Sequence, residues 1–285
     1  MMKEITAGLA LALVSSGGFA TEPTTSLGGK AKVEFPDRDK LKEAYEAPGW
    51  KTLWADEFET AGLPDAAKWN YEEGRVRNRE DQYYVRNRRE NARVENGHLI
   101  ITARHEPWEG ADVTSACLIT LGKFDFCHGK LEIRARLPKG RGTWPALWLM
   151  GSNYEQAGWP HCGEIDLMEF VGFMPDVLHF TVHTDAFNHS RQNQQGTTLE
   201  VERLSEEFHR YGLLWMADEL VWFFDGEPVF RYANAHAGAS QWPFDHPAYI
   251  LMNLAIGGTW GGREGVDPGM LPSEFVVDYV RVWQR

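Results

Sequence analysis

The sequence predicts an all-β protein, an antiparallel β-sandwich or barrel. From residue 50 onwards, short segments alternate apolar and polar residues and are separated by Gly, Pro, Asn and Asp, which is typical of strands joined by turns. The chain shows neither an alternation of helix and strand patterns nor a repeat of roughly 20–50 residues. With 285 residues, 43% of them apolar and 13% aromatic, it can bury a large core.

The expected strands follow the chain in order. Asp225 and Gly226 lie between two apolar runs, and this dipeptide favours a two-residue hairpin turn. We therefore expect one sandwich domain over residues 50–285. The segments that read as strands are GHLIITARH (97–105), GKLEIRARLP (129–138), LHFTVHT (178–184), YGLLWMADELVWFFDGEPVFRY (211–232), YILMNLAIGG (249–258) and EFVVDYVRVWQ (274–284).

The first 49 residues differ from the rest of the chain in composition and pattern. Residues 1–20 resemble a secretory signal peptide, because Lys3 precedes an apolar run and small residues lead to a cleavage site after Ala20. A disordered or buried segment is the alternative. Residues 21–49 read as a linker or N-terminal segment that contains one short helix over 37–46. We therefore expect a protein that is secreted or periplasmic.

Charge and cysteine content restrict the partners. The formal net charge of −12 argues against nucleic acid and anionic membranes, and it favours a neutral ligand. We also expect a monomer. Of the three cysteines, Cys117 and Cys127 are close enough in sequence to bridge adjacent strands, whereas Cys162 would stay unpaired; the sequence does not decide this pairing.

Three carboxylates lie within six positions of the segment WPHCGEIDLMEFVG (159–172). In a regular strand, Glu164 and Asp166 share one face, and Glu169 points to the opposite, apolar face. An unpaired carboxylate in a core costs several kcal/mol. A β-bulge with one inserted residue at 167–168 would return Glu169 to the face of the other two acids.

With this bulge the two glutamates acquire the geometry of a glycosidase pair. Four strand rises separate their Cα atoms by about 13 Å. Side chains that lean together by roughly 4 Å each leave the carboxyl groups about 5 Å apart, which is the gap in retaining glycosidases. The alternative is a solvated strand with scattered acids.

Aromatic residues near this segment indicate a sugar-binding surface. In GTWPALWLMG (142–151), Trp144 and Trp148 share one face, and we expect their indoles to form a flat platform for sugar rings. Trp159 precedes the acidic segment, and Trp260 lies in a glycine-rich loop with unusual backbone freedom. His183 alternates with inward apolar residues beside the acids. A single Trp or His is more often structural, but here they accompany the carboxylates.

The chain resembles glycoside hydrolase family 16, in particular its laminarinase-like endo-1,3-β-glucanases, over about residues 50–285. The resemblance implies a concanavalin A-like jelly roll with a cleft on its concave face. Met168 is the extra residue that separates this bulged branch from the lichenase-like branch. The matching segments are GKLEIRARLPKGRGTWPALWLMG (129–151), GWPHCGEIDLMEFVG (158–172), VHT (182–184), WPFDHPAYILMNLAIGGTWGG (242–262) and VVDYVRVWQ (276–284).

The family resemblance also implies residue roles. Glu164 would be the nucleophile, Glu169 the general acid and base, and Asp166 a residue that holds and tunes the nucleophile. The substrate would contact Trp144, Trp148, Trp159, His183, Asn78 and Trp260. No cofactor is implied for catalysis, but a structural Ca²⁺ is, with ligands at Glu57, Gly97 and Asp278.

Two alternatives remain open. The loop RVRNREDQYYVRNRRE (75–90) is rich in arginine, so a sulfated galactan could be the substrate; solvated arginines are the other interpretation. A glucan-binding module without catalysis could share the fold, but such relatives lack the glutamates that this chain keeps. We therefore predict a secreted endo-glycosidase that hydrolyses β-1,3-glucan with retention, or else a mixed-linkage glucan.

Overall fold

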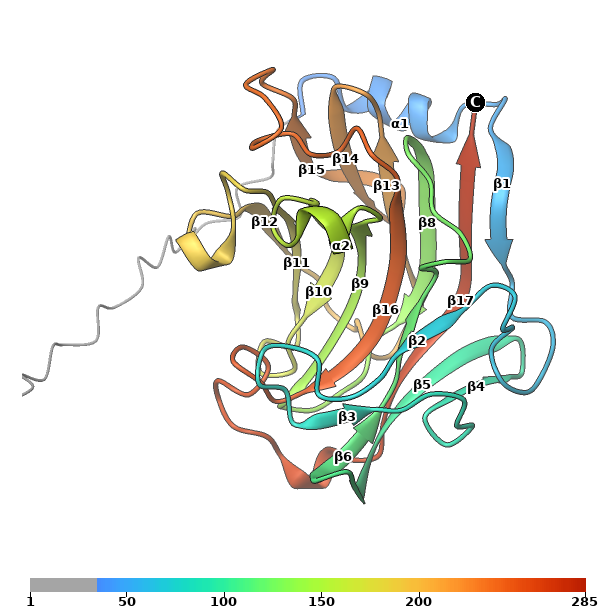
Figure 1. Cartoon of the computed structure of the whole chain (residues 1–285). Coiled ribbons are helices and arrows are strands. Elements are labelled where there is room, and N and C mark those ends of the chain that lie inside the picture. Colours follow the sequence, from blue (N-terminus) through green and yellow to red (C-terminus); the bar gives the residue numbers. More distant parts are fainter. Residues whose placement is uncertain (1–34) are drawn as a thin grey trace, which may run out of the picture. The chain divides into compact units, whose positions relative to one another are not determined.

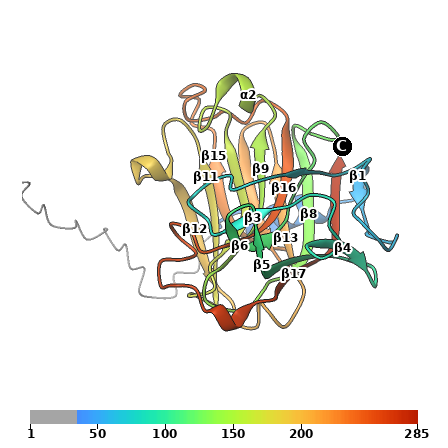
Figure 2. The same ribbon diagram turned by 60° about the horizontal axis from the view of Figure 1, so that its bottom comes forward.

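The structure is a computed structural model that describes residues 35–285, and these residues form one compact unit. The expected signal peptide and most of the expected linker lie outside the described residues. Two sheets pack face to face, and their long strands run in roughly the same direction, as the two views in Figures 1 and 2 show. The predicted all-β sandwich is confirmed.

The seven-stranded sheet carries the acidic segment on β10 in its middle part (Figure 1). Both β9 and β16 are buried along their whole length, because the core covers one face and cleft-lining residues occupy the other. The strand order within residues 35–285 is β12 (Gln195–Glu200), β11 (Val177–His183), β10 (Glu164–Phe170), β9 (Thr143–Gly151), β16 (Ala248–Ile256), β7 (Cys117–Ile119) and β2 (Asn70–Glu72).

The ten-stranded sheet backs the first one. Its strand β17 (Ser273–Gln284) pairs with β8 on one side and β5 on the other, although it comes last along the described chain. The other strands follow the order β15 (Glu227–Ala233), β14 (Glu219–Phe224), β13 (His209–Trp215), β8 (Gly129–Arg136), β17, β5 (His98–Trp108), β6 (Ala111–Ser115) and β3 (Gln82–Tyr84); β1 (Lys51–Asp56) pairs with β17, and β4 (Ala92–Glu95) with β5.

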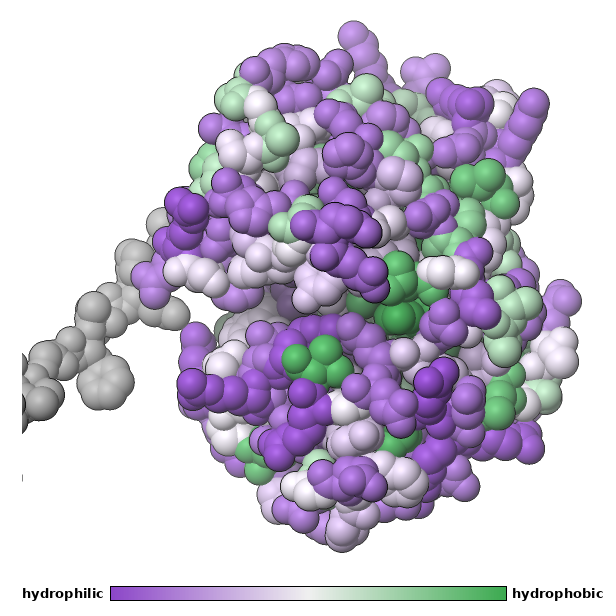
Figure 3. Space-filling model, viewed as in Figure 1, coloured by the Kyte–Doolittle hydropathy of each residue, from purple (hydrophilic) through white to green (hydrophobic). Residues whose placement is uncertain are grey.

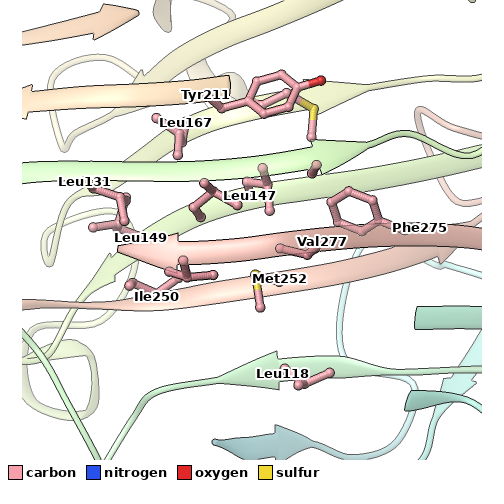
Figure 4. Close-up of a cluster of buried hydrophobic side chains, with 14 of the residues drawn as sticks. Leu118, Leu131, Leu147, Leu149, Leu167, Tyr211, Ile250, Met252, Phe275 and Val277 are labelled. Atoms are coloured by element: carbon pink, nitrogen blue, oxygen red, sulfur yellow. The ribbon is translucent and has the colours of Figure 1, made fainter. Parts of the chain in front are cut away.

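The core fills the space between the two sheets. Leu147 and Leu149 of β9 and Leu167 of β10 point from one sheet toward Leu131 of β8 and Val277 of β17 in the other (Figure 4). These side chains are at most 1% exposed. Full burial of one such side chain contributes about 1.5–3 kcal/mol, so the alternation read from the sequence fixes which face of each strand points inward.

Helices contribute little to the fold. The described ones are α1 (Arg38–Glu46), α2 (Tyr154–Ala157) and the 3₁₀ turns η1 (His189–Arg191) and η2 (Pro268–Met270). None of the helices within residues 35–285 has the length and apolar character needed to cross a bilayer.

Helix α1 belongs to the sandwich unit, although we assigned residues 21–49 to a linker. Its Leu41 and Tyr45 are buried against Val221 and Phe223 of β14 on the outer face of the ten-stranded sheet. The Tyr45 hydroxyl donates a hydrogen bond to the buried Glu132 carboxylate at 2.8 Å. The compact unit therefore begins at Phe35 rather than at Trp50.

Several local predictions can be compared directly with the structure. Asp225 and Gly226 form the expected two-residue turn between β14 and β15, both with positive φ. Cys117, Cys127 and Cys162 are all free, so no disulfide joins the first two.

Candidate active site

The acidic strand β10 carries the predicted β-bulge. Its pairing with β11 shifts register between Asp166 and Glu169, and its pairing with β9 shifts between Asp166 and Met168. Leu167 and Met168 are both fully buried in the core. The insertion therefore lets the strand keep its apolar residues inside and present Glu164, Asp166 and Glu169 on the same face.

This face forms the floor of a cavity of about 410 Å³. Residues from β9, β10, β16 and the loop after β2 contribute to its walls. The lining residues are Glu72, Val76, Arg77, Asn78, Glu80, Trp144, Ala146, Trp148, Met150, Tyr154, Trp159, Glu164, Asp166, Glu169, His189, Tyr249 and Asn253.

Each of the two glutamates is held by the N–H group of one indole. Trp159 Nε1 donates a hydrogen bond of 2.9 Å to Glu164 Oε2. Trp144 Nε1 donates one of 3.1 Å to Glu169 Oε1. Because an N–H donor stabilises the charged form of a carboxylate, both indoles fix the side chains and lower their pKa values.

His183 links the nucleophile position to the central aspartate. Its Nε2 atom lies 3.3 Å from Asp166 Oδ2 and 3.7 Å from Glu164 Oε1. The imidazole is almost completely buried, as is Asp166. The His183 ring therefore lies within ion-pair distance of both carboxylates.

Burial raises the pKa values of all three acids, and neighbouring negative charges add to this effect at Glu164 and Glu169. Burial first, and then the charge of Asp166, raises the pKa of Glu164 to about 7. Burial also raises the pKa of Asp166. Burial together with the charges of Asp166 and Glu164 raises the pKa of Glu169 well above its usual range. The raised pKa of Glu169 favours its protonated form, which a general acid requires.

The tryptophans lie where we predicted but do not form an open platform. Trp144 and Trp148 line the cavity, yet they are only 9% and 6% exposed. The Arg77 guanidinium lies 5.0 Å from the centroid of the Trp148 ring and covers one of its faces. Strand alternation predicts the face on which a side chain lies, but loops and neighbouring side chains decide how far it is exposed.

A buried hydrogen-bond network connects Trp148 to the loop before β3. Trp148 Nε1 donates to Asn253 Oδ1 at 2.8 Å, and Asn253 Nδ2 donates to the Tyr84 hydroxyl at 3.0 Å. That hydroxyl donates to Glu80 Oε2 at 3.2 Å, and Asn78 Nδ2 donates to Glu80 Oε1 at 3.2 Å. The predicted cleft residue Asn78 is thus held by a carboxylate that is itself 3% exposed.

The remaining predicted residues lie farther from the cavity. Trp260 packs edge-on against Trp144, with a centroid distance of 5.4 Å, and is not part of the lining. Glu57 lies after β1, Gly97 in the turn before β5, and Asp278 in β17. These three belong to the ten-stranded sheet, away from the acids.

Sequence reasoning missed several lining residues. Asn253 was detectable, since a lone amide in the apolar strand YILMNLAIGG requires a polar partner. Glu80 carried no such signal, because it alternates with other charged residues in a loop without periodicity. Arg77 was among the loop arginines considered as binders of an anionic glycan, but its ion pair with Glu72 was not predicted. His189 reaches the cleft through a stacked contact with Trp159, with a centroid distance of 4.7 Å.

Paired carboxylates in a cleft on a β-sandwich define a class of glycan-cleaving enzymes. The sequence model of the glycosyl hydrolases family 16 matches residues 79–281. The chain belongs to glycoside hydrolase family 16.

Individual relatives support the same assignment. A β-glucanase of Rhodothermus marinus is 50% identical over 248 residues, which cover 84% of this chain and 87% of the relative. The X-ray structure of the laminarinase from Rhodothermus marinus matches with a TM-score of 0.81 and 49% identity, covering 84% of this chain and 98% of that one. A mutant of a non-specific endo-β-1,3(4)-glucanase, co-crystallised with a glucan oligosaccharide, matches with a TM-score of 0.81 and 43% identity, covering 84% and 96%. The jelly-roll fold is confirmed by these structures.

Proposed function

We propose that the chain hydrolyses internal bonds of β-1,3-glucan with retention of configuration. The observation that carries this proposal is the pair Glu164 and Glu169, which share one face of β10, are each hydrogen-bonded by an indole and have pKa values raised by burial. The three acids are all present in the cleft, which argues against a module that only binds glucan. Enzymes of this family need no cofactor for catalysis.

The mechanism follows from the protonation states. The ionised Glu164 attacks the anomeric carbon and forms a covalent ester, while Glu169 gives its proton to the departing glycosidic oxygen. Water then attacks the ester, and Glu169 takes a proton from that water, so that Glu164 leaves as a carboxylate. Each step inverts the anomeric carbon, so the overall result is retention. Asp166 and His183 lie beside the Glu164 carboxylate and restrict its position.

The charges that line the cavity favour a neutral glycan over a sulfated one. Glu72 and Glu80 lie there together with the three acids of β10, whereas Arg77 is the arginine among the lining residues. Arg77 is already ion-paired with Glu72. Of the loop arginines Arg75, Arg77 and Arg79, which suggested an anionic substrate, Arg75 and Arg79 are exposed and outside the lining, whereas Arg77 lines the cavity. A polyanion would therefore meet a cleft of its own charge.

A product profile tests the substrate class. We expect cleavage of laminarin, and we expect no action on agarose or carrageenan. Lichenan tests mixed-linkage activity, which a relative described as a non-specific endo-β-1,3(4)-glucanase makes worth measuring. Cleavage of carrageenan without any action on laminarin would overturn the proposal.

Azide rescue tests the residue roles. Glu164→Ala should lose laminarin cleavage and, with azide, yield an α-configured glycosyl azide. Glu169→Ala with azide should yield the β-azide, because the nucleophile still works. Near-wild-type cleavage by either variant would contradict the assignment.

We also propose a structural calcium ion away from the cleft. β1 pairs with β17 through Asp56 and Val280, which brings Glu57 toward the strand of Asp278. His98, next to Gly97, lies 3.6 Å from Asp278. Oxygen donors from three separate parts of the chain suit this ion. The Glu57 and Asp278 carboxylates pair with Arg281 and Arg134, and a bound ion would replace these partly exposed ion pairs.

Export and a monomeric state complete the proposal. The pattern of residues 1–20 supports export. The large apolar side chains that are exposed within residues 35–285 are few and separate, and the face in Figure 3 is mostly hydrophilic, which supports a monomer.

A further inference from the structure

Arg77 differs from the other arginines of its loop. Arg75 and Arg79 are exposed, whereas Arg77 lies in the cavity with about a quarter of its side chain exposed. The guanidinium faces Trp148 at 5.0 Å from the ring centroid. This contact places a positive charge in the part of the cleft that lies over β9.

Glu72 fixes the orientation of this guanidinium. Arg77 Nη2 donates hydrogen bonds to both oxygens of the Glu72 carboxylate. The Cys117 thiol donates a further hydrogen bond to Glu72 Oε2, with Sγ and Oε2 3.1 Å apart. The hydrogen bond from Cys117 of β7 thus fixes the Glu72 carboxylate. Arg77 cannot turn away from Trp148 without losing its ion pair with Glu72.

The remaining donors of Arg77 are available. A guanidinium has five N–H donors in a planar fork. Within residues 35–285, no protein atom accepts a hydrogen bond from Nε or Nη1 of Arg77. Because the residue lines the cavity and keeps part of its surface exposed, a bound molecule can accept from these donors.

We propose that Arg77 binds the hydroxyl groups of a sugar unit in the part of the cleft beside Trp148. Trp148 of β9 pairs with Asp166 of β10, so this sugar unit lies beside the acids on the β9 side of the cleft. Arg77 would add affinity for the glycan chain, and its positive charge also lowers the pKa of Glu164. The ion pair with Glu72 neutralises the arginine, which suits a neutral glucan. This inference rests on the proposed glucanase function.

Binding without turnover tests the inference. We would measure the Kd of laminarihexaose by calorimetry in the Glu164→Ala background, with Arg77→Met, Arg77→Lys and the matched control Arg79→Met. Loss of charge-assisted hydrogen bonds should weaken binding about tenfold to a hundredfold in Arg77→Met. Arg79→Met should bind as the background does, because Arg79 is exposed and outside the lining.

The lysine variant separates sugar binding from a structural role. A lysine can keep the ion pair with Glu72, but it lacks the planar fork that reaches the sugar as well. We expect weaker binding in Arg77→Lys too, with an unchanged Tm. Background-like binding by either Arg77 variant would overturn the inference. If the Glu164→Ala background itself fails to bind laminarihexaose, the proposed function fails instead.

Discussion

The two indoles that hold the glutamates should control opposite limbs of the pH–activity profile. Trp159→Phe removes the N–H donor to Glu164, and Trp144→Phe removes the donor to Glu169. Each donor favours the charged carboxylate, so each substitution raises the pKa of its glutamate. Phenylalanine keeps most of the apolar contact, which makes the two variants matched controls for each other.

The size of the effect follows from the hydrogen bond. A hydrogen bond to a charged group contributes about 1.5–3 kcal/mol, and one pKa unit corresponds to about 1.36 kcal/mol. Each pKa should therefore rise by about one to two units. Activity requires an ionised Glu164, so Trp159→Phe moves the acidic limb of kcat/KM to higher pH. Activity requires a protonated Glu169, so Trp144→Phe moves the alkaline limb to higher pH.

The assay is kcat/KM for laminarin from pH 4 to pH 10, roughly the range in which both raised pKa values are expressed. Trp159→Phe should lose activity about tenfold or more below pH 7, and the loss should disappear only as the pH passes the raised pKa of about 8–9. Equal losses at every pH in both variants would refute the reasoning, since the indoles would then act only by packing or by binding sugar.

Three further predictions concern stability. Burial raises the folded-state pKa of Glu164 to about 7, above its unfolded value of 4.5, so its stabilising contribution is complete below pH 4.5 and is lost as the pH rises toward 7. Glu164→Gln should therefore raise Tm by several degrees at pH 8, on the order of 3 kcal/mol, and leave it unchanged near pH 4.5. Tyr45→Phe removes a donor from buried Glu132 and should lower Tm by a few degrees, about 1–3 kcal/mol, with kcat/KM unchanged. Chelation by EDTA should lower Tm without altering the cleavage products if an ion binds at Glu57 and Asp278, because a ligand of the folded state stabilises by mass action; an unchanged Tm in metal-free protein would remove these residues as ligands.

The alternation of side chains made the sandwich and the bulge predictable. In a regular strand, Glu169 would point to the apolar face of β10. One inserted residue turns it to the other face, and the register shift before Glu169 is this insertion. The apolar run LVWFF of β14 also contained information that we did not use. Val221 and Phe223 point away from the core, so both faces of the strand had to be covered, and α1 covers the outer one.

The environment of the cleft loop could not be derived in this way. Asn78 and Arg79 both have positive φ, and no periodicity relates such a loop to the sheet beneath it. The burial of Glu80 and Arg77 depends on contacts with Tyr84, Trp148 and Glu72, which come from other elements. A charged residue in a charged segment looks the same in sequence whether it is solvated or buried.

The place of β17 has a consequence for how the chain matures during synthesis. This strand joins β8 to β5, and it also provides the partner of β1 near the start of the described chain. A ribosome that has released only residues up to about 270 has therefore produced two half-sheets with open edges. The ten-stranded sheet can close only after residue 284 has emerged, and until then the nascent chain exposes edges that aggregate readily unless chaperones protect them.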